Sequence, residues 1–431
     1  RVATNARSHR FAIGLAVVAI AVTAWVVMRP APPKPSTSST PSDATPPAAP
    51  TKSVAVLPFE NLSRDQENEP FCDGISDELL NLLGKIAGLT VKGRTSAFSF
   101  KGQALADTEI GQKLSVAYIV NGSLQKAGSQ VRIMVRLVNT ADGVVVWSDK
   151  FTDELKDIFS VQDRIAGQIA EKLQLKLTAA PRATKTVNPE AHRLVLEGRY
   201  HSSFRTTEGF VRAEGAFTEA IARAPGFAQA HAGLAEVCVM RANYATQDGA
   251  SGGDVQADIK RARIEAQQAM AIDPALSEAY GALAYCDYME KHYEEADRQY
   301  ARALALNSNH SILYAWRAML RLSQGRLEDG VRDLEKTIEL DPLWPVSMSN
   351  CADMLLCVGR VDEARQLIER AMNLRQGVFA PTLSVRAKVL MAMGRKEEAI
   401  ETARLIRKHL HQNPRRGADE TALWTLRQAG L

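Results

Sequence analysis

The sequence predicts an α+β domain followed by an all-α solenoid of helical hairpins, with a single transmembrane helix at the N-terminal end. Three observations lead to this prediction. A helical segment recurs with a period of 34 residues in the C-terminal half of the chain. Strand-like and helix-like segments are mixed in the N-terminal half, and an apolar run precedes both.

The repeat is the strongest signal in the chain. Similar helical segments end at Pro274, Ser308, Pro342 and Gln376, each 34 residues after the one before. A fixed period of this size is typical of stacked helical hairpins. Small residues recur where two helices must touch, and bulky residues recur where gaps must be filled. The small positions include Ala213, Ala262, Ala296, Gly330 and Ala364, and the bulky positions include Phe217, Tyr300, Leu334 and Ile368.

These columns resemble those of the tetratricopeptide repeat (TPR) family, with Tyr293, Gly325 and Gly359 in its inter-helix turn. The resemblance implies a TPR superhelix of about six helical hairpins over residues 190–412, followed by a C-terminal tail at 413–431. In such a superhelix, the first helix of each hairpin lines a concave groove that binds a protein or peptide. Aromatic and Met side chains in these columns suit a groove for an apolar or helical peptide, although some of the groove residues could instead pack between repeats. The predicted groove residues are Glu236, Met240, Tyr285, Met289, Met319 and Asp353.

Residues 53–180 predict a separate domain of strands and helices. Residues 53–59 are a short apolar run ended by proline, as in a buried strand, and residues 77–86 carry leucines on one helical face. Three further strands are expected, and in the middle one apolar residues alternate with Arg132, Met134 and Arg136, which indicates one solvent-facing side. The prediction is a layer of helices on an antiparallel meander. The three strands span 118–125, 131–138 and 144–151, and a closing helix spans 158–177.

This stretch resembles the TolB amino-terminal-like domain. The matching segments are VAVLPFENLS at 54–63, FCDGI at 71–75, RTS at 94–96, YIVNGSL at 118–124, and residues 143–147. In that family the domain often lies between a transmembrane helix and TPR repeats, as in membrane-anchored cyclase-linked or winged-helix (CadC-like) bacterial regulators. The resemblance implies a cytoplasmic effector, and because the chain begins at Arg1 rather than methionine, we expect that effector upstream.

Residues 11–28 are uncharged, and at about 1.5 Å per residue they span roughly 27 Å, close to the ~30 Å hydrocarbon core of a bilayer. The basic segment 1–10 precedes this run, and the Pro-rich linker 29–52 follows it as an extended stalk. The arginines before the run predict a single-pass inner-membrane protein whose C-terminal bulk is periplasmic. The alternative is a signal peptide cleaved near Ala24, which also leaves the bulk outside the cytoplasm.

Composition and motifs predict neither a catalytic site nor a nucleic-acid-binding surface in this chain. A net charge of +4, with 24% charged residues, gives no electrostatic case for nucleic-acid binding. The usual phosphate, zinc and nucleophile motifs do not occur, so we expect no enzyme, cofactor or metal site. Five cysteines without local pairing are not a disulfide framework. The acidic residues Asp65, Glu67, Glu69 and Asp73 indicate a solvated loop, with a cation site as the alternative.

The function predicted from the sequence is a membrane-anchored bacterial signalling protein in the periplasm, with a TolB-like sensor or assembly domain and a TPR solenoid that binds protein or peptide partners. One alternative is the regulatory half of a class III adenylate or guanylate cyclase, or of a winged-helix transcription regulator. Another alternative is an envelope assembly scaffold. The sequence identifies neither the ligand nor the oligomeric state.

Overall fold

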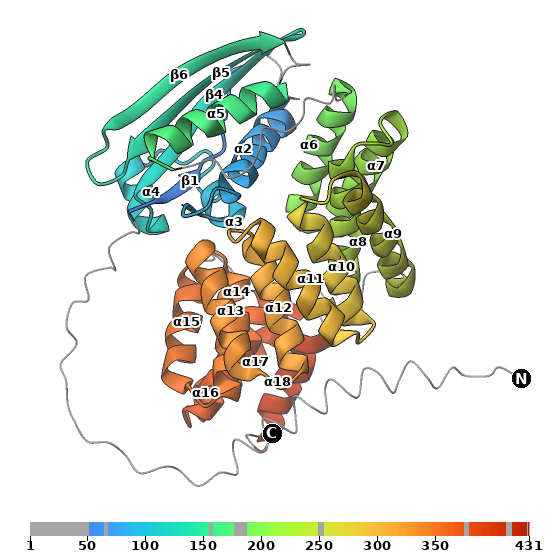
Figure 1. The fold of residues 1–431 in the computed structure, drawn as a ribbon. Helices are drawn as coiled ribbons and strands as arrows, with labels where there is room; N and C mark the ends of the chain where they lie inside the picture. The colour runs from blue at the N-terminus through green and yellow to red at the C-terminus, as the bar shows by residue number, and fades with distance from the viewer. Residues whose placement is uncertain are drawn as a thin grey trace, which may run out of the picture. The chain divides into compact units, whose positions relative to one another are not determined.

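The fold is given by a computed structural model that describes residues 51–63, 68–154, 158–175, 188–248, 254–374, 379–410, 416–428 and 430 (Figure 1). Contacts divide the chain into two compact units, of which the larger includes Pro47–Ser347 and the smaller includes Met348–Asn413 and Ala418–Leu431. No helix among the described residues is both long and apolar enough to cross a membrane. The predicted transmembrane segment 11–28 and the basic segment 1–10 lie outside the described residues.

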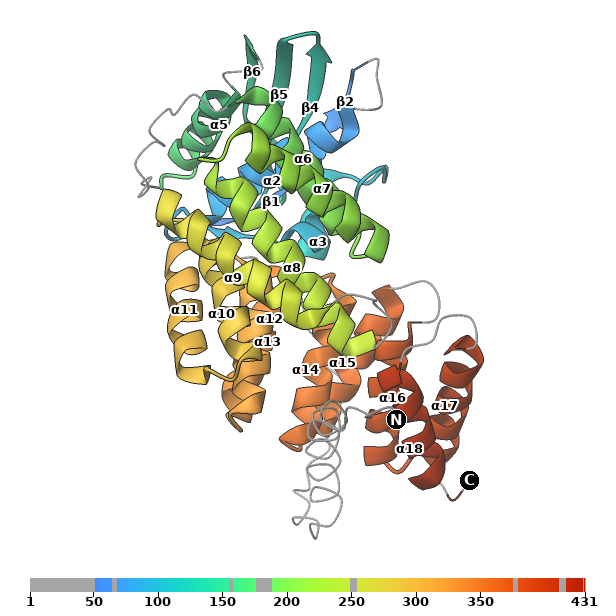
Figure 2. The same ribbon diagram turned by 90° about the vertical axis from the view of Figure 1, so that its right-hand side faces the viewer.

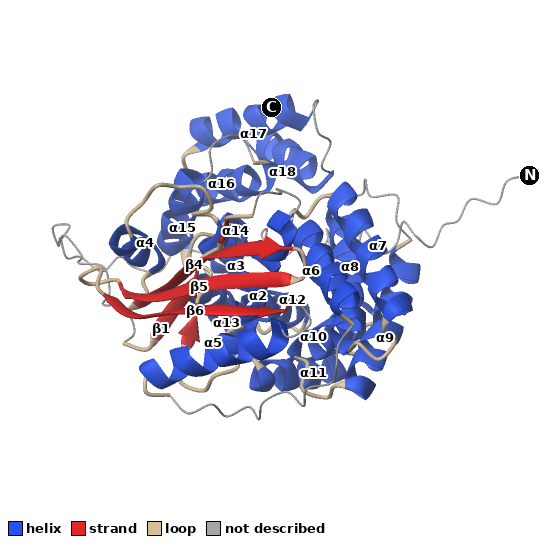
Figure 3. Ribbon diagram, turned by 90° about the horizontal axis from the view of Figure 1, so that it is seen from above, coloured by secondary structure: helices blue, strands red, loops and turns tan. Residues whose placement is uncertain are grey.

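The sheet of the larger unit is mixed, with the strand order β3-β1-β4-β5-β6 and with β2 paired to β4. Figure 3 shows its strands β1, β4, β5 and β6 from above. Strands β4 to β6 form the expected antiparallel meander, but β1 runs parallel to both β3 and β4. The sequence analysis did not predict this parallel pairing of β1, which arises because helices between these strands return the chain to the same end of the sheet. The strands are β1 Ser53–Val56, β2 Glu60–Asn61, β3 Thr90–Val91, β4 Tyr118–Ala127, β5 Gln130–Asn139 and β6 Val145–Glu154.

Four helices accompany the sheet: α2 Glu69–Gly84, α3 Arg94–Phe98, α4 Asp107–Leu114 and α5 Ile158–Lys172. The apolar faces of α2 and α5 share one core with β4 and β5, while α4 packs on the opposite face of β1 and β4. In β5, Ile133 and Val135 are buried and Met134 is 49% exposed, which confirms the predicted alternation. One face of the meander is therefore in contact with solvent.

The predicted acidic loop is partly a helix. α2 begins at Glu69 with proline in its first turn, a position where a missing N–H costs nothing. Glu69 and Asp73 therefore lie one turn apart on the same helix, and Lys101 Nζ lies 2.6 Å from Glu69 Oε1 and 2.7 Å from Asp73 Oδ1. The positive charge beside these two carboxylates is therefore the ammonium group of Lys101 in the same chain. Asp65 and Glu67 lie outside the described residues.

The repeat region consists of antiparallel helix pairs, as Figure 2 shows for α6 to α13. The small and bulky columns fill the space between them, since Ala296 and Tyr300 are fully buried and Leu334 nearly so. Gly325 and Gly359 have positive φ in the turns between paired helices, where a side chain would be strained. These are TPR-type hairpins. The pairs are α6 Pro189–Ser203 with α7 Thr207–Arg223, α8 Ala228–Asp248 with α9 Val255–Ile272, α10 Ser277–Met289 with α11 Tyr293–Leu306, α12 Ser311–Ser323 with α13 Leu327–Leu340, α14 Pro345–Cys357 with α15 Val361–Leu374, and α16 Ala380–Ala392 with α17 Lys396–Leu410.

A further helix, α18 Arg416–Gln428, lies in the segment expected as a C-terminal tail. Its Ala418 and Ala422 are buried in a small apolar cluster with Leu383 of α16 and Ala403 of α17. α18 therefore covers the apolar surface that the last hairpin would otherwise expose, which is how terminal repeats of a solenoid are usually protected.

His231 of α8 joins its helix to the paired helix α9 and to the turn that precedes α8. Its Nδ1 lies 2.7 Å from Glu265 Oε2 on α9, and its Nε2 lies 3.0 Å from the Pro225 carbonyl oxygen. Both nitrogens can donate at once only in the protonated ring. The hydrogen bond with Glu265 raises the pKa of His231 above its ordinary value, and burial opposes this increase only in part.

We predict that His231 makes stability fall as the pH rises. Because the pKa of His231 is higher in the folded protein than in the unfolded chain, its contribution is complete below the unfolded value and is lost as the pH passes through the folded one. Urea midpoints measured between about pH 6 and 9 should fall for the wild type. The His231→Gln variant should have a smaller fall over the same interval, and equal falls would contradict the assignment.

Candidate functional site

The inner helices of the first hairpins face α2 and α3 of the α+β domain within the larger unit. Leu196 of α6 is fully buried in the same apolar cluster as the α+β core. A Cβ atom added to Gly74 of α2 would lie 2.6 Å from the Cβ of Leu196, so α2 and α6 approach closely only because Gly74 has no side chain. The inner surface predicted to bind a partner is therefore covered, over its first hairpins, by a helix of the same chain.

Three polar contacts accompany this packing, and we call them the docking contacts. The first is centred on Glu78 of α2, which is 3% exposed. Its Oε1 lies 3.1 Å from Arg199 Nη1, and its Oε2 lies 3.4 Å from His192 Nε2, both on α6. A buried carboxylate is tolerated when it is paired and hydrogen-bonded in this way, and removing its partners leaves an uncompensated charge.

The second docking contact is Asn309, in the turn before α12. Its Oδ1 accepts a hydrogen bond of 2.9 Å from the Val91 backbone N–H in the edge strand β3. Its Nδ2 donates to the carbonyl oxygens of Gly84 and Leu89, also at 2.9 Å. One amide therefore satisfies three backbone groups at the end of α2 and the edge of the sheet, which would otherwise be buried without partners.

The third docking contact is Asp341, in the turn after α13. Its Oδ1 accepts a hydrogen bond of 2.6 Å from the Ser96 N–H in α3 and a second one from the Ser96 hydroxyl. Burial raises the pKa of Asp341, and these bonds from Ser96 oppose the increase. Beside it, the Gly93 N–H donates to the Leu340 carbonyl oxygen at 2.7 Å and so caps the C-terminal end of α13.

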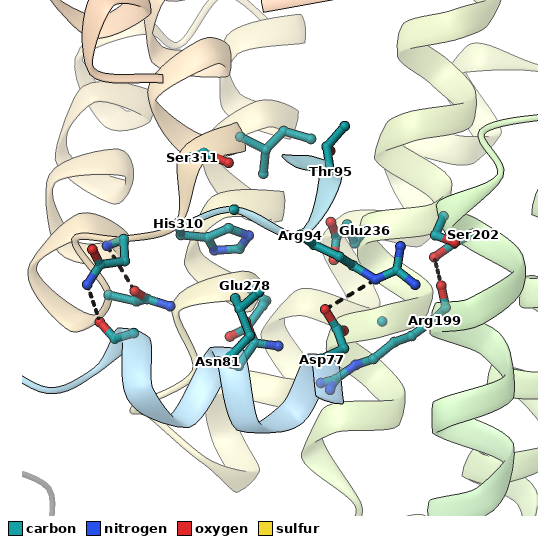
Figure 4. Close-up of a pocket in the computed structure, with 18 of the residues that line it drawn as sticks. Asp77, Asn81, Arg94, Thr95, Arg199, Ser202, Glu236, Glu278, His310 and Ser311 are labelled. Atoms are coloured by element: carbon teal, nitrogen blue, oxygen red, sulfur yellow. Dashed lines mark hydrogen bonds and ion pairs between the residues drawn. The ribbon is translucent and has the colours of Figure 1, made fainter. Parts of the chain in front are cut away.

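A cavity of about 170 Å³ lies between the three docking contacts (Figure 4). Its walls come from α2 and α3 on the α+β side and from α6, α8, α10 and the start of α12 on the repeat side. Gly84, Gly93 and Ala232 line it, and a Cβ at Gly93 would lie only 2.7 Å from the carboxyl carbon of Asp341. Charged side chains from both sides line it: Asp77, Arg94, Arg199, Glu236, Glu278 and His310.

The two glutamates of the cavity differ in their electrostatic environment. Burial raises the pKa of Glu236. Burial also acts to raise the pKa of Glu278, but the positive charges of Lys85, His310 and Arg199 outweigh it and lower the pKa to about 2. Glu278 is therefore ionised at neutral pH, and its Oε2 is buried without a hydrogen-bond partner among the described residues.

The six predicted groove residues do not form one surface in the structure. Glu236 and Met240 line the cavity. Tyr285 is 1% exposed, and its ring packs against Trp316 at 5.4 Å between centroids, so it is a core residue of the kind considered as the alternative. Met289 and Met319 are half-buried on α10 and α12, outside the lining of the cavity. In the smaller unit, Asp353 pairs with Lys388 at 2.8 Å.

The sequence analysis missed the docking contacts because their residues resemble ordinary turn residues. In an earlier copy of the repeat, Asp273 Oδ1 accepts a hydrogen bond from Ala275 N–H in its own turn, 2.9 Å away. Asp341 occupies the same repeat position but binds Ser96 in the other domain. The available signal was the pair of asparagines at 307 and 309, since two polar amides in one short turn exceed what local capping requires.

Other reactive groups of the described chain do not form a second site. Asp287, Glu290 and His292 are close enough to share a metal ion, but Arg263 Nη2 already lies 2.7 Å from Asp287 Oδ1 and 2.8 Å from Glu290 Oε2. All five cysteines are free thiols. Burial raises the pKa values of Cys72, Cys238 and Cys286 to about 12, so these thiols are protonated and poor nucleophiles.

Comparison with known proteins finds one matching family model and several relatives of this chain. Residues 50–168 match the family described as the second domain of HilA/YgeH-like transcriptional regulators. A protein of Rhizobium meliloti (strain 1021) named "Putative adenylate cyclase 3" is 33% identical over 199 residues, which are 45% of this chain and 34% of that protein. Hsp70-Hsp90 organizing protein 3 of Arabidopsis thaliana is 27% identical over 116 residues, which are 27% of this chain and 21% of that protein.

The chain thus spans about a third or less of the length of these curated relatives. Among solved structures, that of PilF from Pseudomonas aeruginosa is similar at 18% identity and a TM-score of 0.40, and the match covers 52% of this chain and 92% of that one. The class of this protein follows from its own hairpins, with their buried small and bulky columns and their glycine turns. Its repeat region is built of TPR-type helical hairpins, and an α+β domain precedes them.

We predict that Asn309→Ala destabilises the larger unit by about 2–4 kcal/mol, because it removes three hydrogen bonds and leaves buried backbone groups without partners. Urea denaturation of the full chain measures the change. Asn373→Ala, on the exposed surface of α15, is the matched control and should stay within about 0.5 kcal/mol of the wild type. Equal effects of the two variants would mean that Asn309 does not join the domains.

Proposed function

We propose that this chain is the sensory and partner-binding part of a membrane-anchored bacterial signalling protein, and that its α+β domain is of the TolB amino-terminal-like type. The observation that carries the proposal is the packing of α2 against the inner helix α6, with Leu196 inserted against Gly74. A partner-binding surface that is partly covered by a helix of the same chain suits regulation, because a partner and α2 would compete for it.

Partners bind, in this proposal, to the part of the groove that α2 leaves uncovered. Met289 and Met319 are half-buried on the inner helices α10 and α12 and adapt in shape to an apolar or helical segment of a protein or peptide. One relative is named as an Hsp70-Hsp90 organizing protein, which supports a protein as the partner class. The chain itself performs no catalysis in this account.

The effector lies in another part of the full protein, on the cytoplasmic side of a transmembrane helix at residues 11–28, and the described domains are periplasmic. Two effectors are supported. A nucleotide cyclase is favoured by the name of the Rhizobium relative. The aligned stretch covers only 34% of that protein's length. A winged-helix transcription regulator is favoured by the match of residues 50–168 to a transcription-regulator domain.

The test is to disturb the packing of α2 and measure the effector in the intact protein. Gly74→Leu places a side chain where even a Cβ would lie 2.6 Å from Leu196, so we expect a several-fold change in cyclic-nucleotide production or promoter activity at unchanged protein abundance. Gly215→Leu is the matched control, because a Cβ at Gly215 meets nothing within 4 Å. The identity of the effector is read first from the coding sequence upstream.

Unchanged output in the Gly74→Leu variant, with α2 undocked as judged by faster proteolysis, would overturn the regulatory role. The same strains carry a C-terminal alkaline phosphatase fusion, which is active only outside the cytoplasm. We expect activity, and an inactive but stable fusion would contradict the periplasmic orientation.

A further inference from the structure

The cavity between the docking contacts contains a carboxylate that the described chain does not satisfy. Glu278 is ionised, since its pKa is about 2, and its Oε2 is buried without a hydrogen-bond partner among the described residues. A buried, charged acceptor that lacks a donor is costly, and a ligand that supplies an N–H group would remove that cost. Glu236 of α8 faces the same cavity, as Figure 4 shows, so a cationic group would meet the carboxylate of Glu278 and the carboxyl group of Glu236.

The α+β side of the cavity offers an arginine with spare donors. Arg94 Nε lies 3.4 Å from Asp77 Oδ1, and the guanidinium carbon lies 4.0 Å from the centre of the Phe98 ring. This long contact through one nitrogen leaves the two terminal nitrogens of the guanidinium able to bind a carboxylate side-on. Arg199 is anchored to α2, since its Nη1 lies 3.1 Å from Glu78 Oε1, and its charge acts on Glu236 and Glu278.

The dimensions of the cavity limit the ligand to a small molecule. Its volume of about 170 Å³ is below the roughly 300–1,000 Å³ of pockets for drug-sized ligands, and a folded peptide does not fit. The hydroxyl of Ser202 and the amide of Asn81 add neutral polar groups to its wall. Both sides carry charges of both signs, but Glu278 Oε2 on the repeat side lacks a donor among the described residues and Arg94 on the α+β side has spare donors, so the matching small molecule carries an ammonium and a carboxylate.

We infer that this cavity binds a free α-amino acid, with the ammonium held by Glu236 and Glu278 and the carboxylate held by Arg94. The inference goes beyond the proposed function, because it concerns a small ligand between the domains and not a protein partner in the groove. Such a ligand touches α3 on one side and α8 and α10 on the other, so it stabilises the docked arrangement.

The test uses the full chain, purified in detergent, with the twenty L-α-amino acids as probes. We expect at least one amino acid to raise the melting temperature and to give a measurable Kd by calorimetry. The α-amide of that amino acid lacks the carboxylate, and its N-acetyl form lacks the ammonium. Each derivative should bind about tenfold or more weakly, because each loses a charge-assisted contact.

Two variants locate the site. Glu278→Gln and Arg94→Gln should each weaken binding by about tenfold or more. Glu219→Gln and Arg212→Gln alter exposed helix-surface ion pairs outside the cavity and should leave the Kd unchanged. If a cavity variant fails to fold, the derivative series on the wild type decides by itself.

The inference is overturned if none of the twenty amino acids binds. It is also overturned if the amide and N-acetyl forms bind as well as the parent, or if the control variants weaken binding as much as the cavity variants do. Binding is measured on the purified chain without any effector, so its failure is distinguishable from a failure of the proposed signalling role.

Discussion

The close contact between Leu196 of α6 and Gly74 of α2 is the feature on which the rest of the larger unit depends. It extends the apolar core of the α+β domain into the repeats and brings α2 against their inner helices. Burial of this surface supplies the free energy, and the polar docking contacts then fix the orientation, because each buried polar group must find its partner. Glu78, Asn309 and Asp341 have their hydrogen-bond partners in the other domain. These contacts lie at three separate points along the junction between the α+β domain and the repeat region.

This arrangement changes how the solenoid can function. A TPR superhelix usually offers its whole inner surface to partners, whereas here the first hairpins face a helix of the same chain. A partner that needs this part of the surface must bind more tightly than α2 does, and a ligand that prefers the docked arrangement makes displacement harder. The charged cavity belongs to both sides of the junction, so whatever occupies it acts on this equilibrium directly. In the proposed function, regulation and recognition therefore share one surface.

Sequence reasoning recovered the repeat, because columns such as Ala296 and Tyr300 follow a fixed period and the structure buries them. It also recovered the alternation in β5, since one face of that strand contacts solvent. It missed the parallel pairing of β1, which depends on where the intervening helices return the chain. The cavity could not be predicted, because Arg94 and Glu278 meet only through the packing of two domains, and neither residue has a local signal for the other. Tyr285 misled the prediction, since an aromatic residue on an inner helix can pack in the core as readily as it can face a groove.

Hydrogen exchange at three backbone amides tests the central claim most directly. In the α+β domain, the N–H groups of Val91, Gly93 and Ser96 all donate to residues of the repeat region, namely Asn309, Leu340 and Asp341. Because no other strand or helix of the α+β domain supplies these acceptors, the protection of the three amides from exchange reports on the contact between the two domains. The account predicts that all three amides exchange about as slowly as those in the middle of β4. Exchange at the rate of exposed loop amides, with β4 still protected, would show that the two domains do not dock.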